Sequence, residues 1–170
     1  MPIIICEKSK SAFRVASILS NQNFKTLNFG RVKIYQFTDK NKTNFVIGLK
    51  GHILSLDYPM KYSVWNLVGL RELIYVQPYK EPSERAIIAA LEKFAKESDA
   101  VIIATDYDRE GELIGVESLE ILKKFNPEIN IKRARFSALT EKDVKSAFSN
   151  LCDIDYNLAK SAEARQIIDL

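Results

Sequence analysis

The sequence predicts an α/β fold in which a mostly parallel central sheet is flanked by helices. Two short, uncharged apolar runs, residues 3–6 and 100–104, are typical of strands that are buried on both faces. Apolar residues also recur at offsets of three and four over residues 12–19 and 87–94, which is the pattern of a helix that packs on a sheet. Strands that alternate with helices build βαβ units, and such units place their strands parallel.

The middle of the chain departs from this alternation. Residues 29–49 are rich in β-branched and aromatic side chains around the polar tract 39–43, so we expect an inserted β-hairpin with a longer loop. Residues 56–80 hold the only tryptophan, four tyrosines and two prolines, and we expect irregular chain packed on the domain. Pro82 and Ser83 then open the next helix. For the first helix, Ser9 or Ser11 is available as the N-terminal cap.

The last third of the chain continues the pattern of helices and strands. An apolar helix face extends to Phe125, and Pro127 ends that helix. Residues 131–136 are expected to form a strand, whose basic side consists of Lys132, Arg133 and Arg135. Thr140 and Asp143 resemble a capping box that begins another helix, with Asp in the place of the usual Glu.

Four carboxylates lie within seven residues after the second apolar run: Asp106, Asp108, Glu110 and Glu112. Open α/β sheets place their ligands at this carboxyl edge of the strands. Carboxylates this close repel one another, and a divalent cation that prefers oxygen ligands, above all Mg²⁺, relieves the repulsion. The motif therefore predicts a metal site, and the alternative is an acidic turn before a helix whose first turn favours Asp and Glu.

Glu7 and Lys8 close the first apolar run in the same way. If that strand lies beside the strand that ends at Asp106, then Glu7 reaches the same edge of the sheet. An acid or base would then stand next to the metal. The sequence leaves this adjacency open.

The charge is unevenly spread over the chain. The net charge is +3, but residues 1–50 hold nine Lys and Arg against two acidic residues, a net charge of +7, and the remainder stands at −4. The basic part suggests a polyanion as partner. Cys6 and Cys152 have no ligand-like or redox spacing, which argues against a disulfide or a zinc site. No apolar run approaches the roughly 20 residues that span a bilayer, and we find no signal peptide, so we expect a cytoplasmic protein without a membrane partner.

The acidic motif resembles a known family. The strand that ends in Glu7 and Lys8, followed about a hundred residues later by an acidic motif, looks like the Toprim domain of topoisomerases, bacterial primases and some nucleases. The string ATDYDREGE at residues 104–112 is similar to the A-T-D-x-D-R-E-G-E signature of type IA DNA topoisomerases. Residues 135–169 resemble the segment that enters their next domain, and the start of the chain looks closer to topoisomerase III and the archaeal enzymes.

The resemblance implies a Toprim domain over residues 1–152 and the start of a following helical domain over residues 153–170. It implies an enzyme that cuts one DNA strand through a phosphotyrosine link and reseals it, with the nucleophilic tyrosine outside this chain. Asp106, Asp108, Glu110 and Glu7 would hold Mg²⁺, which Mn²⁺ could replace. Glu7 would act at the leaving oxygen either as proton donor or as a further metal ligand, and Lys8 would contact a phosphate.

The resemblance also carries weaker expectations. His52 and Arg165 match positions that face a single DNA strand, whereas Arg109 and Glu112 are expected to give structural support. Tyr107 should point away from its acidic neighbours, into the domain or a neighbouring layer. The chain alone is expected to be inactive and to need the remaining domains of the same polypeptide. A free-standing Toprim nuclease and a non-catalytic nucleic-acid-binding module are the alternatives.

Overall fold

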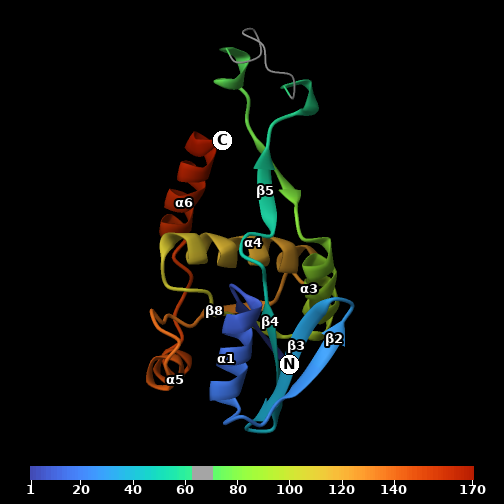
Figure 1. Cartoon of the computed structure of the whole chain (residues 1–170), viewed down its shortest axis with the longest axis vertical. Coiled ribbons are helices and arrows are strands. Elements are labelled where there is room, and N and C mark those ends of the chain that lie inside the picture. The colour runs from blue at the N-terminus through green and yellow to red at the C-terminus, as the bar shows by residue number, and fades with distance from the viewer. Residues whose placement is uncertain (63–70) are drawn as a thin grey trace.

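A six-stranded sheet forms the centre of the chain in this computed structural model, which describes residues 1–62 and 71–170 (Figure 1). The strands are β1 (Pro2–Cys6), β2 (Lys25–Phe29), β3 (Val32–Asp39), β4 (Lys42–Gly48), β7 (Ala100–Ile103) and β8 (Asn130–Arg133). Their order is β2-β3-β4-β1-β7-β8, and β1 pairs in parallel with both β4 and β7, while β7 pairs in parallel with β8. The predicted α/β fold with a mostly parallel sheet is confirmed.

Helices cover both faces of this sheet. They are α1 (Ser9–Leu19), α3 (Arg85–Glu97), α4 (Arg109–Phe125), α5 (Glu141–Ser149) and α6 (Tyr156–Asp169). Alternate residues of β1 point to opposite faces, so Ile3 and Ile5 join one core with α3 and α4, whereas Ile4 and Cys6 join a second core with α1 and α5. Helix α6 packs on the outer side of α4, beyond the sheet (Figure 1).

The predicted hairpin is present as β3 and β4, but its turn is tight. Asp39 pairs with Lys42, and the two turn residues Lys40 and Asn41 have φ angles of 47° and 63°, the left-handed pair that two-residue hairpin turns require. Strand β2 adds a third antiparallel strand to the hairpin. Strand β2 was not predicted, because four of its five residues are exposed and Phe29 packs only partly against the core.

A second, two-stranded sheet lies where irregular chain was expected. Strands β5 (Leu54–Asp57) and β6 (Tyr79–Pro82) pair antiparallel, and the 3-10 helix η1 (Met60–Tyr62) follows β5. This ribbon extends away from the main sheet (Figure 1). The tryptophan at position 65 lies outside the described residues. Within residues 1–62 and 71–170, the helices are all too short or too polar to cross a membrane.

The ends of helices and strands correct three further expectations. Helix α1 is capped by Lys8 without a side-chain hydrogen bond, so neither Ser9 nor Ser11 is the cap. Pro82 ends β6, and α3 begins only at Arg85. The strand expected over residues 131–136 ends at Arg133. The N-terminal cap of α5 is confirmed, because Thr140 Oγ1 accepts a hydrogen bond from the Asp143 amide at 3.1 Å, and the Thr140 hydroxyl donates to Asp143 Oδ2 at 2.7 Å.

Candidate metal and nucleic-acid site

The acidic residues gather at the carboxyl edge of the sheet because β1 and β7 are neighbours. Ile5 pairs with Ile103, and the Ala104 amide donates a hydrogen bond to the Ile5 carbonyl at 2.7 Å. Glu7 therefore leaves β1 at the edge where Asp106 leaves β7. The adjacency that the sequence left open is present in the fold.

Asp106 lies in a strongly negative environment. Partial burial raises the pKa of its carboxyl group most, and the carboxylates of Glu7 and Asp108 raise it further, against the opposing charges of Lys8 and Arg133. Lys8 Nζ lies 3.1 Å from Glu7 Oε1, and this contact, together with Asp106 and Asp108, raises the pKa of the Lys8 ammonium group. Glu7, Lys8, Asp106 and Asp108 thus form one electrostatic unit, which we call the acidic edge.

The turn that carries Asp106 and Asp108 is tied to the start of α4. Asp108 is the N-terminal cap, and its Oδ1 accepts a hydrogen bond from the Gly111 amide at 2.7 Å. Thr105 Oγ1 donates to the Gly111 carbonyl at 2.7 Å. A Cβ atom on residue 111 would collide with the Asp106 carbonyl, so only glycine allows the turn to approach the helix this closely. Asp108 therefore combines a capping role with its place at the acidic edge.

A buried ion pair supports this turn from inside. Arg133 and Glu112 are fully buried, and Arg133 Nε lies 2.8 Å from Glu112 Oε2. The rest of the guanidinium group donates to the carbonyl oxygens of Ile103, Thr105, Asp106 and Ala134. The structural role expected for Glu112 agrees with this pair. Arg133 was expected to contribute to a basic side of its strand, but it is fully buried and pairs with Glu112 inside the core.

His52, just before β5, forms a separate cluster with side chains of α4 and α6. Its Nδ1 is 2.8 Å from Glu117 Oε1, and its Nε2 is 3.3 Å from Glu110 Oε2 and 3.2 Å from the side-chain nitrogen of Gln166 on α6. The hydrogen bond to Glu117 is the main reason that the pKa of His52 is raised, although burial opposes it. The structure therefore gives Glu110 a partner in His52.

Glu117 is a residue that the sequence analysis missed. Its side chain is 2% exposed, and its Oε2 accepts hydrogen bonds from the amides of Ile53 and Leu54, at 3.1 and 3.4 Å, where β5 begins. A signal was available, because Glu117 stands three residues after Ile114 and four before Ile121 on the apolar stripe of α4. An acidic residue within such a stripe indicates a buried carboxylate with a specific partner.

Arg165 and Tyr107 lie at the surface. Arg165 is exposed on α6, with its Nε 3.4 Å from Asp169 Oδ2. Tyr107 is 41% exposed, and the guanidinium group of Arg135 lies 5.0 Å from the centre of its ring. The expectation that Tyr107 points into the domain is therefore wrong.

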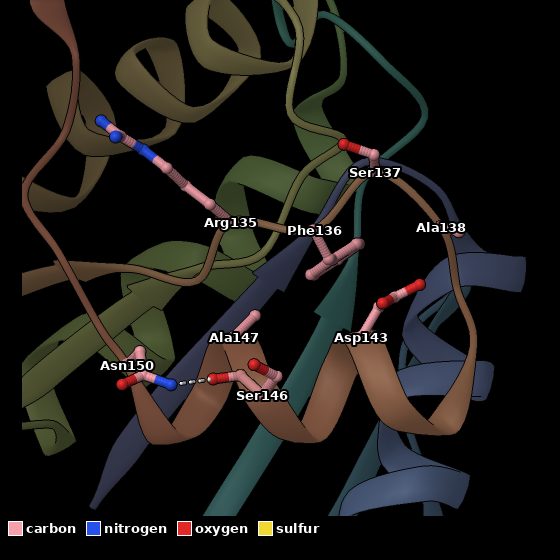
Figure 2. A pocket seen from close by; sticks show the side chains of 8 residues that line it. All are labelled: Arg135, Phe136, Ser137, Ala138, Asp143, Ser146, Ala147 and Asn150. Atoms are coloured by element: carbon pink, nitrogen blue, oxygen red, sulfur yellow. Dashed lines mark hydrogen bonds between the residues drawn. The ribbon is translucent and has the colours of Figure 1, made fainter.

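One cavity is lined by Arg135 and its neighbours and by no residue of the acidic edge. It has a volume of about 330 Å³ and lies between residues 135–138 and one side of α5 (Figure 2). Asn150 at its margin donates a hydrogen bond to the Ser146 carbonyl at 2.9 Å, and the Arg135 side chain extends away from α5. None of the predicted site residues lines this cavity.

The donor atoms at the acidic edge suit a hard divalent cation in kind. Among the described residues, no three His, Cys, Asp or Glu side chains are arranged to hold a metal ion by themselves. Mg²⁺ commonly binds proteins through one or two carboxylates and completes its octahedron with water and substrate phosphates. The residues therefore fit an ion shared with water and a phosphate better than an ion enclosed by protein.

One protein family matches most of the chain, and several relatives match nearly all of it. The Toprim domain family matches residues 2–139. A protein of Archaeoglobus fulgidus named DNA topoisomerase 1 is 48% identical over 168 residues, which are 99% of this chain and 25% of that protein. The human protein named DNA topoisomerase 3-alpha is 31% identical over 178 residues, covering 99% of this chain and 18% of that protein. The chain thus spans a quarter or less of these relatives.

A solved structure supports the fold. The full-length topoisomerase I of Thermotoga maritima matches 98% of this chain and 24% of its own, with a TM-score of 0.64 and 24% identity. The Toprim match covers most of the chain and includes all four residues of the acidic edge. The chain belongs to the Toprim domain family and is homologous to the Toprim part of type IA DNA topoisomerases.

Proposed function

We propose that this chain is the cation-binding part of a type IA DNA topoisomerase, which cleaves and religates one DNA strand through a phosphotyrosine intermediate. The observation that carries the proposal is the acidic edge, where Glu7, Lys8, Asp106 and Asp108 act on one another. The names of the homologous proteins support the same activity. The nucleophilic tyrosine would come from another domain of a longer polypeptide, and residues 153–170 would begin the domain that follows residues 1–152.

Each residue of the acidic edge has a chemical role in this proposal. Asp106 and Asp108 would hold Mg²⁺, or Mn²⁺ in its place, and the bound cation would offset the negative charge that develops at the scissile phosphate. Lys8 would contact that phosphate as a point charge. Glu7 would transfer a proton at the leaving oxygen or serve as a further ligand. Glu110 belongs to the proposed metal set through its motif, and its partner in the structure is His52.

The proposed nucleic-acid partner is a single DNA strand that passes the acidic edge. His52 and Arg165 would face this strand together with Lys8. His52 is about one third exposed and Arg165 is exposed, so both side chains are accessible. The proposed enzyme would act in the cytoplasm without a membrane partner.

The test uses the longer polypeptide that contains the following domains. Labelled single-stranded DNA is incubated with enzyme and Mg²⁺, the protein is denatured, and label that stays on the protein is measured. Glu7→Gln and the double variant Asp106→Asn/Asp108→Asn should lose the protein-bound label, whereas Asp39→Asn, at the opposite edge of the sheet, should keep it. Cleaved DNA with no label on the wild-type protein would refute the proposal in favour of a nuclease that activates water.

A further inference from the structure

A second cavity opens at the same edge of the sheet as the acidic residues. It has a volume of about 230 Å³. Its charged rim consists of Arg31, Lys33 and Lys50, and its apolar floor consists of Val32, Leu49 and Ile87. We call it the basic cavity. None of its rim residues belongs to the acidic edge or to the His52 cluster.

The strand order explains why these residues meet. Phe29 pairs with Val32, so Gly30 and Arg31 form the two-residue turn between β2 and β3. Strand β3 runs antiparallel to β4, so its beginning, with Lys33, lies beside the end of β4. Lys50 lies two residues after the end of β4 and forms a β-bridge with Lys8. The basic cavity therefore lies at the carboxyl edge of β4, next to the acidic edge on β1.

The cavity attracts anions more strongly than its three cations alone would. Ser9, the first residue of α1, also lines it, and this helix has no capping side chain and no acidic residue in its first turn. The amides and the dipole at such a helix start favour a negative charge. Lys50 forms an ion pair with Glu84, whose Oε2 lies 3.0 Å from Lys50 Nζ. Arg31 and Lys33 are exposed at the surface.

We propose that the basic cavity binds one nucleotide of a single DNA strand, a proposal that rests on the proposed function. A backbone phosphate would contact Arg31, Lys33 and the start of α1, and the base would lie on the apolar floor. An unpaired base is free to turn into a cavity, whereas a paired base must first be broken out of its duplex, so a single strand is the ligand that fits both parts best. The cavity would also hold the strand beside Glu7, whose carboxylate and its acidic neighbours repel phosphates.

Two matched charge removals test this proposal. Arg31→Ala/Lys33→Ala removes two cations at the rim, and Lys40→Ala/Lys42→Ala removes two cations from the other end of the same hairpin. Binding of a labelled thymidine 12-mer is followed by fluorescence anisotropy at several salt concentrations without divalent cation. Because each phosphate contact on a single strand adds about 0.7 to the salt dependence, the rim variant should lower the slope by about 1.4. The control variant should leave both slope and affinity close to wild type.

The outcomes separate this proposal from the one it rests on. Equal losses of DNA affinity in the two variants would show that only net charge matters. Such a result would overturn the proposed binding in the cavity, while DNA binding by the chain would stand. A wild-type chain that binds no oligonucleotide would overturn the cavity and the DNA partner together. A 12-mer without bases should bind the wild type more weakly than the thymidine 12-mer. Equal binding would refute the proposal that the base lies on the apolar floor. If the double variant unfolds by circular dichroism, Lys33→Gln alone should lower the slope by about 0.7.

Discussion

Removing the charge of Glu112 should destabilise this chain more than any other single carboxylate change on α4. Both oxygens of Glu112 are acceptors, because Oε2 receives Arg133 Nε at 2.8 Å and Oε1 receives the Asp155 amide at 2.8 Å. In Glu112→Gln one of these oxygens becomes an NH₂ group. Either orientation of the glutamine therefore sets a donor against a donor, and Arg133 loses its counter-charge inside the protein.

The expected size follows from the burial of the pair. Breaking a buried ion pair by neutralising one partner costs about 3–5 kcal/mol, because an uncompensated charge remains. Four carbonyl contacts still solvate the guanidinium group in the variant, which places the cost toward the lower end of that range. For a chain of 170 residues, we expect the melting temperature to fall by roughly 6–20 °C.

The assay is urea or thermal unfolding followed by circular dichroism, with Glu120→Gln as the control. Glu120 lies on the same helix and pairs with Lys80 at 2.9 Å, but its side chain is 41% exposed. Exposed ion pairs contribute about 0–1 kcal/mol, so this control should change little. A Glu112→Gln variant that loses less than about 1 kcal/mol would refute the account of the buried pair.

Three other predictions follow from the same contacts. Glu117 raises the pKa of His52 in the folded state. The stability that His52 contributes should therefore be complete below its unfolded pKa and be lost as pH rises through its folded pKa. In unfolding experiments, His52→Gln should cost more stability at pH 5 than at pH 9. Gly111→Ala should destabilise the chain by about 1–3 kcal/mol, since the added methyl group meets the Asp106 carbonyl, and wild-type stability in urea would contradict this. The chain alone should form no covalent DNA adduct, and an adduct lost in Tyr107→Phe would show that the nucleophile is already present.

The parts of the fold that the sequence predicted are those with a strong local signal. Residues 3–6 and 100–104 are uncharged apolar runs, and they form the two central strands that carry the site. Strand β2 has no such signal because four of its five residues are exposed and it contains no apolar run. The Thr140 cap was recognised because both partners lie within four residues, whereas the capping of α1 by Lys8 involves no side-chain bond that a sequence could reveal.

The sequence placed Glu7 and Asp106 at the ends of two strands and left open whether those strands are neighbours. Glu7 and Asp106 meet as the fold requires, but the partners of Glu110 and Arg133 come from distant parts of the chain. Arg133 stands between other basic residues in the sequence, and nothing there indicates that its side chain points inward. It does so because it pairs with Glu112 on α4, 21 residues earlier. Such pairings depend on how helices pack, which local patterns do not encode.

The central claim is that the acidic edge binds a divalent cation, and titration with Mn²⁺ tests it most directly. Broadening of amide signals is followed by NMR in the wild type, in Asp106→Asn/Asp108→Asn, and in the control Asp39→Asn/Glu97→Gln, which removes two exposed carboxylates elsewhere. We predict that the wild type and the control lose the signals around residues 7–8 and 105–109 at the same Mn²⁺ concentration, and that the Asp106/Asp108 variant keeps them. Equal broadening in all three proteins would contradict a cation site at this edge of the sheet.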